Sequence, residues 1–236
     1  MLKSIFYPTK QNAFIWLSAI YLLFLLYLGK ISPLTILFAY FLETIIIGIF
    51  NALKMLWSIL YGKSEKSSFG LILFFLFHYG FFVAIQSIFG FALFGIEGNG
   101  IIKEPFNLVE NYSTILTLED IKYALPAVLV THLGKFITDY IHNEKYKKFT
   151  AKEIMFKPYV RIFLQQFVVI ISFFFIVFSK AGVIAAVLLI LFRLVLDLIL
   201  DSVKENSKTI DFLSEKLKNE KTSIEEIKKQ LIHFTE

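Results

Sequence analysis

Cysteine is absent from the 236-residue sequence, so disulfides, thiolate metal sites and thiol nucleophiles are all excluded. Several catalytic signatures are missing as well. No Gly-rich phosphate loop precedes a helical run, and no G-x-S-x-G serine motif occurs. The His-x-x-x-His and Glu-x-x-His spacings of zinc proteases and di-iron bundles do not occur either. The sequence therefore offers no local pattern of a common hydrolase, nucleotide enzyme or metalloprotease.

Charge is also scarce, because Asp, Glu, Lys and Arg make up only 18% of the chain, against about 25% in an average soluble domain. Hydrophobic residues account for 57%, and 28 residues are Phe. The mean hydropathy is +0.68. These values indicate an integral membrane protein. The net charge of +5 comes largely from lysines in short loops and in the tail, which is typical of membrane topology, so we expect no nucleic-acid partner.

Six long apolar runs predict an all-α integral membrane bundle of about six transmembrane helices, since about 20 residues are needed to cross a bilayer core. The expected spans are residues 13–28, 33–61, 69–94, 119–142, 159–178 and 181–203. Residues 95–118 are expected to form a loop, and residues 144–157 a basic connector that leads through Pro158 into the fifth span. The predicted domains are the bundle, 1–203, and a cytoplasmic helical tail, 204–236.

The lysines of the short segments between the runs predict the orientation of the bundle. The amino end, the second-to-third loop, the fourth-to-fifth connector and the tail are rich in lysine. The opposite side holds little beyond Lys30, Lys103 and Lys180. The positive-inside rule then places both termini in the cytoplasm. We therefore expect a multi-pass protein of the cell membrane, with the lipid bilayer as its partner.

The tail carries apolar residues on a and d heptad positions that only Glu220 interrupts, namely Ile210, Leu213, Leu217, Ile224, Ile227, Leu231 and Phe234. This pattern predicts a coiled coil and a homo-oligomer formed through residues 210–234. Two alternatives stay open. The tail is amphipathic and could lie on its own protein or on the bilayer, or it could break into two helices, because Ser223-x-x-Glu226 is a capping box.

Polar residues within the apolar runs are costly in a membrane and need partners or water. On a helix, Lys54 lies about 20° and Asn51 about 80° round from Glu43, so the three share one face. The expected depths bring polar residues of the second to sixth spans to a similar level. The candidate intramembrane polar site comprises Glu43, Asn51, Lys54, His78, Gln86, His132, Lys135, Asp139, Arg161, Gln166, Arg193 and Asp197.

This polar site has three interpretations. It is either a hydrated cavity that opens to the cytoplasm, or a set of structural ion pairs that fix the register of the helices, with Lys54, Arg161 and Asp201 extending to the interface. In the third interpretation a metal, or less favourably a haem, is held by His78 and His132, with Glu43 or Asp139 completing the ligands. No local pattern requires a cofactor.

The pattern Y-x-x-E-x-x-x-x-G-x-x-N-x-x-K-M at Tyr40–Met55 resembles that of a family of prokaryotic polytopic membrane proteins catalogued only as a domain of unknown function. His78-Tyr79-Gly80 resembles the third-helix motif of this family, and Pro158-Tyr159-x-Arg161-Ile162 resembles the start of its fifth helix. Asp197 matches as well. The resemblance spans roughly residues 35 to 200, and the tail lies outside it.

The same resemblance implies an intramembrane constellation rich in histidine, and hence metal or haem chemistry. His78 and His132 keep their positions in that pattern. Other histidines of the family pattern correspond here to Gln86, Gln166 and Asp201. Because Gln is a poor metal ligand, these departures put metal chemistry in doubt for this chain.

The function predicted from the sequence is permeation or transport of an ion or small polar solute through a cytoplasm-facing cavity. In this hypothesis Glu43 and Asp139 bind or relay cations or protons. His78 and His132 titrate, and Lys54 and Lys135 balance the charge. One alternative is a membrane scaffold with a structural polar core and a tail that recruits partners. The other is a membrane-embedded metal or haem enzyme, which the sequence favours least.

Overall fold

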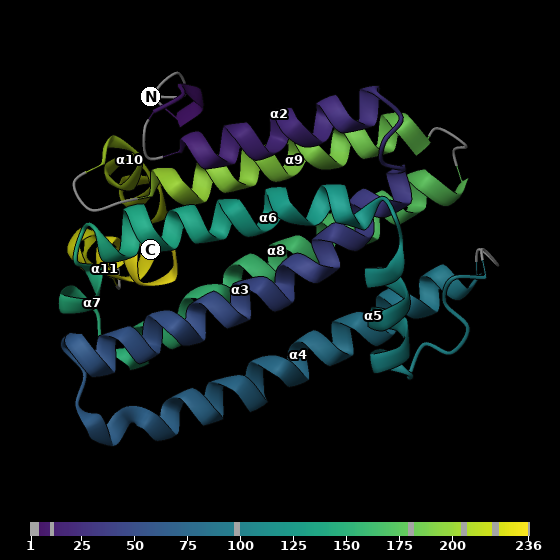
Figure 1. Cartoon of the computed structure of the whole chain (residues 1–236). Helices are drawn as coiled ribbons and strands as arrows, with labels where there is room; N and C mark the ends of the chain where they lie inside the picture. Colours follow the sequence, from purple (N-terminus) through teal and green to yellow (C-terminus); the bar gives the residue numbers. More distant parts are fainter. Residues whose placement is uncertain are drawn as a thin grey trace.

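The computed structural model describes residues 5–9, 12–96, 100–178, 182–203, 207–218 and 222–235, and this part of the chain is all-α. The long helices lie side by side (Figure 1). They are α2 (Ala13–Tyr27), α3 (Pro33–Tyr61), α4 (Phe69–Ile96), α6 (Ile121–Lys135), α8 (Ala151–Phe178) and α9 (Gly182–Ser202). The shorter helices are α5 (Leu108–Thr117), α7 (Lys145–Lys148), α10 (Lys208–Leu217) and α11 (Ile224–Thr235), and a π-helical segment, Phe136–Ile141, extends α6.

Helix α3 is the central element, because it packs against α4, α6, α8 and α9. Its start is well specified by sequence. Ser32 is the N-cap and its hydroxyl accepts a hydrogen bond from the Thr35 amide at 3.2 Å, and Pro33 occupies the first helical position. A helix in this position meets neighbours on several faces, so the polar residues of α3 have partners on several other helices.

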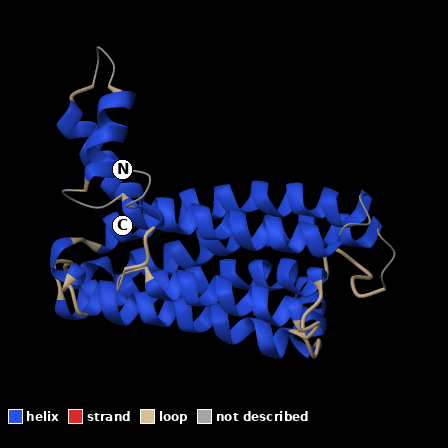
Figure 2. Ribbon diagram, turned by 90° about the horizontal axis from the view of Figure 1, so that it is seen from above, coloured by secondary structure: helices blue, strands red, loops and turns tan. Residues whose placement is uncertain are grey.

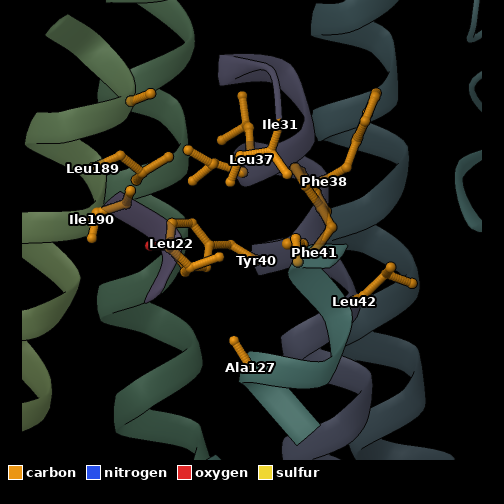
Figure 3. Close-up of a cluster of buried hydrophobic side chains, with 14 of the residues drawn as sticks. Leu22, Ile31, Leu37, Phe38, Tyr40, Phe41, Leu42, Ala127, Leu189 and Ile190 are labelled. Carbon is orange, nitrogen blue, oxygen red and sulfur yellow. The ribbon is translucent and has the colours of Figure 1, made fainter. Parts of the chain in front are cut away.

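A closely packed apolar core fills the end of the bundle where α3 begins (Figure 3). Aromatic pairs join α3 to α4 there, since the rings of Phe38 and Phe94 lie 4.8 Å apart and those of Phe41 and Phe91 lie 5.9 Å apart. All four phenylalanines are buried. Both termini, by contrast, lie at the other end of the bundle, together with α7, α10 and α11 (Figure 1).

Tyr79 locks α4 onto α3 at a glycine. The Tyr79 hydroxyl donates a hydrogen bond to the Thr44 carbonyl oxygen at 2.7 Å. The ring passes so close to Gly48 that a Cβ added there would lie 2.4 Å from Tyr79 Cε1. Only a residue without a side chain allows this approach. Gly48 of the Tyr40–Met55 motif therefore leaves the space that the ring of Tyr79, from the His78-Tyr79-Gly80 motif, occupies.

Three helical segments of the described chain are long and apolar enough to be candidate membrane spans: Pro33–Tyr61, Lys66–Phe94 and Gly182–Ser202. They correspond to the second, third and sixth expected spans. Helix α2 is apolar but has only 15 residues, fewer than the roughly 20 that a bilayer requires. Six spans are therefore not established by length and composition.

Two boundaries expected from the sequence are wrong. The predicted basic connector, residues 144–157, is instead α7 followed by the first two turns of α8, which continues through Pro158. The predicted loop 95–118 contains the short helix α5, whose start is capped by the Asn107 side chain. Proline ends most helices because it removes a backbone hydrogen bond, so the continuation of α8 needs a specific compensation.

The tail forms two helices, as the capping-box alternative predicts. The Ser223 hydroxyl accepts a hydrogen bond from the Glu226 amide at 3.2 Å. Helix α11 packs against both α10 and α8, and the heptad residues Ile210 and Ile227 are buried within the chain. The helices near the termini project from the side of the main bundle (Figure 2). The structure therefore gives no support to a continuous coiled coil, and the division into bundle and tail stays a prediction.

The contact between Gly48 and Tyr79 predicts an asymmetric response to alanine. Gly48→Ala should lower the free energy of unfolding by about 1–3 kcal/mol, because the added methyl group displaces a buried ring. Gly80→Ala is the matched control, since a Cβ there meets nothing within 4 Å, and alanine is favoured over glycine in a helix. Thermal unfolding of the purified protein in detergent measures both. Equal melting temperatures for the two variants would contradict this packing.

Candidate functional site

A buried ion cluster surrounds the carboxylate of Glu43, whose side chain is 1% exposed. His132 on α6 places Nε2 at 2.7 Å from Glu43 Oε1. Arg161 on α8 donates to the same oxygen at 3.2 Å, and Arg193 on α9 also donates to it. Three helices thus converge on one oxygen of a fourth. Burying a carboxylate is unfavourable unless cations and hydrogen bonds compensate it, and this arrangement supplies both.

Asp197 completes the ion cluster as its second carboxylate. Arg161 contacts Asp197 Oδ1 at 2.7 Å, and the Nε of Arg193 lies 3.7 Å from Asp197 Oδ2. Arg193 and Asp197 are four residues apart on α9, so they face the same side of that helix. The Arg193 guanidinium also lies over the Tyr40 ring, 4.8 Å from its centroid. Two guanidiniums therefore face two carboxylates, and the formal charges within the cluster balance.

A cavity of about 120 Å³ lies beside the ion cluster, toward the end of the bundle that holds α7 and the termini. Its polar lining comes from six segments of the chain. Helix α3 contributes Asn51 and Lys54, α6 contributes His132 and Lys135, and the π-helical segment contributes Asp139. The same cavity is lined by residues of α7, α8 and α9, namely Lys145, Lys157, Arg161 and Asp201.

Aromatic rings and backbone bonds hold the cationic lining in place. Lys54 Nζ lies 5.7 Å from the centroid of the Tyr140 ring, and the Tyr140 hydroxyl donates to the Lys54 carbonyl at 2.7 Å. Lys157 Nζ lies 3.6 Å from the centroid of the Phe149 ring. Cations over aromatic faces are stabilised electrostatically. These contacts keep charged side chains at the cavity and away from the apolar exterior.

Asn51 compensates the proline in α8. Pro158 lacks the N–H that would otherwise bond the carbonyl oxygen of Ile154 within the helix. The side-chain amide of Asn51 donates to that same oxygen at 3.2 Å. Asn51 is buried, so the bond satisfies a donor and an acceptor that would both be costly to leave unpaired. The asparagine of the Tyr40–Met55 motif and the proline of the fifth-helix motif are therefore partners.

His132 and Arg161 belong to both the cavity and the ion cluster. Each lines the cavity and also contacts the Glu43 carboxylate. Any solute in the cavity would therefore meet groups that already hold a buried carboxylate. A second, much smaller void on the far side of Arg193 and Asp197 is lined by residues of α2, α3, α6 and α9.

The residues predicted from the sequence divide into three groups. The ion cluster contains Glu43, His132, Arg161, Arg193 and Asp197. The cavity contains Asn51, Lys54, His132, Lys135, Asp139 and Arg161. The remaining three residues, His78, Gln86 and Gln166, have no role in the ion cluster and do not line the cavity.

In this third group, only His78 has a hydrogen-bond partner among the described contacts. His78 Nδ1 lies 2.7 Å from the Tyr159 hydroxyl of α8. Gln86 is buried, and both polar atoms of its side chain lack a hydrogen-bond partner among the described residues, as does Gln166 Oε1. Their assignment to an intramembrane polar site stays a prediction, and the sequence does not reveal that His78 has a different partner from Glu43.

No group of three or more His, Asp or Glu side chains in the described part of the chain could hold a metal ion. His132 Nε2 forms a hydrogen bond with Glu43, and His78 Nδ1 forms one with the Tyr159 hydroxyl. The two imidazoles thus have different partners, and the metal-ligand role of this pair stays a prediction without geometric support.

Sequence reasoning missed the part that Lys145, Lys157 and Asp201 play in the cavity lining. Lys145 and Lys157 lie in the segment interpreted as a connector, and Asp201 was expected only to reach the interface. A signal was nevertheless present. If the helix runs through Pro158, Lys157 and Arg161 are four residues apart and share one face.

The bond from Asn51 to the Ile154 carbonyl predicts coupling between Asn51 and Pro158. Asn51→Ala should lower the free energy of unfolding by about 1–3 kcal/mol, since it leaves the carbonyl unpaired. In a Pro158→Ala background the helix can form its own bond to that carbonyl, so the same change should cost clearly less. Unfolding of the four proteins in one detergent gives the coupling energy. Additive effects would show that the two residues act independently.

The ion cluster predicts that Glu43 is critical for stability. Glu43→Gln should lower the free energy of unfolding by about 3–5 kcal/mol, because it leaves buried guanidinium charge uncompensated. The control is Glu144→Gln, which removes the exposed Lys147–Glu144 pair at 2.6 Å and should change stability by no more than about 1 kcal/mol. Chemical or thermal unfolding in detergent distinguishes the two. A Glu43→Gln protein as stable as the control would refute the structural role of the cluster.

A family model with the description Family of unknown function (DUF6498) matches residues 1–225. No curated protein and no solved structure matches the chain. The matched region includes the ion cluster, the cavity and most of the tail. Because the match covers nearly the whole sequence, the chain belongs to the Family of unknown function (DUF6498).

Proposed function

We propose that this chain is a polytopic membrane protein that moves a small ion or polar solute across the bilayer by way of its cavity. One observation carries the proposal. A cavity lined by charged side chains from six segments lies within a helical bundle that contains three candidate membrane spans. Charged groups inside a membrane bundle are rare and typically mark the path of an ion or a substrate.

The membrane setting of the proposal combines the three candidate spans with the remaining long helices. Helices α2, α6 and α8 complete a six-span bundle, in which α6 and α8 are more polar because they carry the lining of the cavity. Lysine-rich segments lie at the end that holds both termini, and the positive-inside rule places this end in the cytoplasm. The cavity would then be reached from the cytoplasmic side.

The opposite side of the bundle is closed in this conformation. The packed phenylalanines of α3 and α4, including Phe38, Phe41 and Phe94, fill the other end. A carrier works by exposing one central site alternately to either side. A cavity near one end and a packed core at the other are what such a carrier needs in its inward-facing state.

The ion cluster is well placed to act as the closed gate of this carrier. Arg161 and Arg193 share the carboxylates of Glu43 and Asp197. If Arg161 moves toward a solute, Arg193 still contacts both carboxylates. Pairs can therefore be exchanged without leaving a carboxylate uncompensated, which keeps the cost of a conformational change low.

This role differs from the cation relay expected for Glu43 from the sequence. Oxygen Oε1 of Glu43 already accepts from Arg161 and Arg193 and lies beside His132, so the geometry does not favour a further cation there. The scaffold alternative gains no support either, because α11 packs on α8 of the same chain. The metal-enzyme alternative has no cluster of ligands within the described residues.

Solute flux in proteoliposomes tests the proposal. Liposomes containing the purified full chain should take up at least one of potassium, chloride, sulfate, phosphate or glycerol faster than empty liposomes. Lys54→Gln should slow this uptake by about tenfold or more, because hydrogen bonds to charged groups typically contribute 1.5–3 kcal/mol. The substitution preserves the backbone bond between Lys54 and Tyr140.

Lys147→Gln is the matched control, since Lys147 is an exposed lysine of α7 that pairs with Glu144 and does not line the cavity. Its uptake should equal that of the wild type. Uptake no faster than that of empty liposomes for all five solutes would refute the proposal. Equal loss in both lysine variants would place the effect outside the cavity.

A further inference from the structure

The lining of the cavity carries an excess of positive charge. Among the described residues that line it are four lysines and two aspartates, namely Lys54, Lys135, Lys145, Lys157, Asp139 and Asp201. Arg161 lines the cavity as well, but the ion cluster already matches its charge, because two guanidiniums face two carboxylates there. The four lysines therefore exceed the two aspartates by two positive charges.

These lysines are partly shielded from bulk water. Lys145 is 8% exposed and contacts Asp139 at 3.1 Å, and the other three lysines are half-buried. Like charges held together at low dielectric repel strongly. An anion in the cavity would relieve this repulsion, and the excess of two matches a doubly charged ion.

The volume of the cavity restricts the anion to a small one. At about 30 Å³ per water molecule, the 120 Å³ of the cavity corresponds to a few water molecules. Pockets for drug-sized molecules are typically 300–1,000 Å³. The cavity is therefore too small to enclose a nucleotide, whereas a central atom with four oxygens is of a suitable size.

The distribution of the lysines over several helices favours a tetrahedral oxyanion over a halide. Lys54, Lys135, Lys145 and Lys157 lie on four different helices, α3, α6, α7 and α8. Each ammonium group has three donors and no acceptor. Lysines that line one cavity from four helices can donate to several acceptor oxygens of a single ion, and lysine binds phosphate groups as a point charge.

We infer that the cavity binds a small, doubly charged tetrahedral oxyanion, a phosphate or sulfate group that is either free in solution or part of a lipid headgroup. For the movement of this anion, but not for its binding, the inference rests on the proposed function. Lys54, Lys135, Lys145 and Lys157 supply the donors, while Asp139 and Asp201 limit the excess of charge.

Titration calorimetry on the full chain in maltoside micelles, a detergent without phosphate, tests this inference. Sodium phosphate and sodium sulfate should give saturable binding, and sodium chloride at equal ionic strength should not. Lys54→Gln should raise the dissociation constant of phosphate by about tenfold or more. Lys157→Gln should act in the same direction and serves as the second variant if the first does not fold. Lys147→Gln should leave the constant unchanged.

Asp201→Asn provides the most discriminating measurement, because the sign of its effect depends on the ligand. Removing a negative charge from the lining should tighten phosphate binding, whereas it would weaken the binding of a cation. No saturable binding of either oxyanion, or weaker phosphate binding by a folded Asp201→Asn protein, would overturn the free-anion form of the inference.

A second titration in the same micelles distinguishes the source of the anionic group. Phosphatidic acid is the probe, and phosphatidylcholine is the reference. Saturable binding of phosphatidic acid without binding of free phosphate would assign the site to a lipid headgroup, and binding of neither would overturn the inference altogether. Oxyanion binding without flux would refute the proposed transport but support the binding site. Flux of potassium or glycerol without oxyanion binding would support transport but refute the oxyanion site.

Discussion

The pairing of one buried carboxylate with groups from three other helices is the interaction on which the rest of the structure depends. Glu43 lies on α3, the helix that contacts α4, α6, α8 and α9, and its oxygen Oε1 is contacted by His132, Arg161 and Arg193. An unpaired charge at this depth would cost several kcal/mol, so the helices cannot separate or rotate freely at this level. The position of the cavity follows from this, because its inner wall consists of groups that the carboxylate fixes.

The short motifs of the sequence make physical sense as pairs across helices. Gly48 of α3 leaves space for Tyr79 of α4. Asn51 of α3 bonds the carbonyl that Pro158 of α8 leaves free, and Glu43 pairs with Arg161. The residues of a single helical motif thus have different partners, which no one-helix interpretation explains. Each motif describes half of a contact.

The fold was predictable where apolar length alone decides the structure, as in α3, α4 and α9. It was not predictable for α8, because a proline normally ends a helix and the compensating Asn51 lies about 100 residues away in sequence. For the site, depth along the helices predicts Glu43, His132, Arg161, Arg193 and Asp197 at a similar level, and their side chains form one cluster in the structure. Depth could not separate them from His78, because the direction in which a side chain faces depends on which helices are neighbours. The cationic character of the cavity was missed because Lys145 and Lys157 resemble loop residues in sequence.

The bond between Asn51 and the Ile154 carbonyl has a mechanical consequence. At this point the hydrogen bond that Pro158 removes from the backbone of α8 is replaced by one from a side chain of another helix. Sliding α3 by a few ångströms would withdraw that donor and free α8 to bend one turn below Arg161. Bending of α8, displacement of α3 and reorientation of the guanidinium are then one event with one energetic cost. Asn51 of α3 thus controls whether α8 can bend at Pro158, although the two residues lie on different helices.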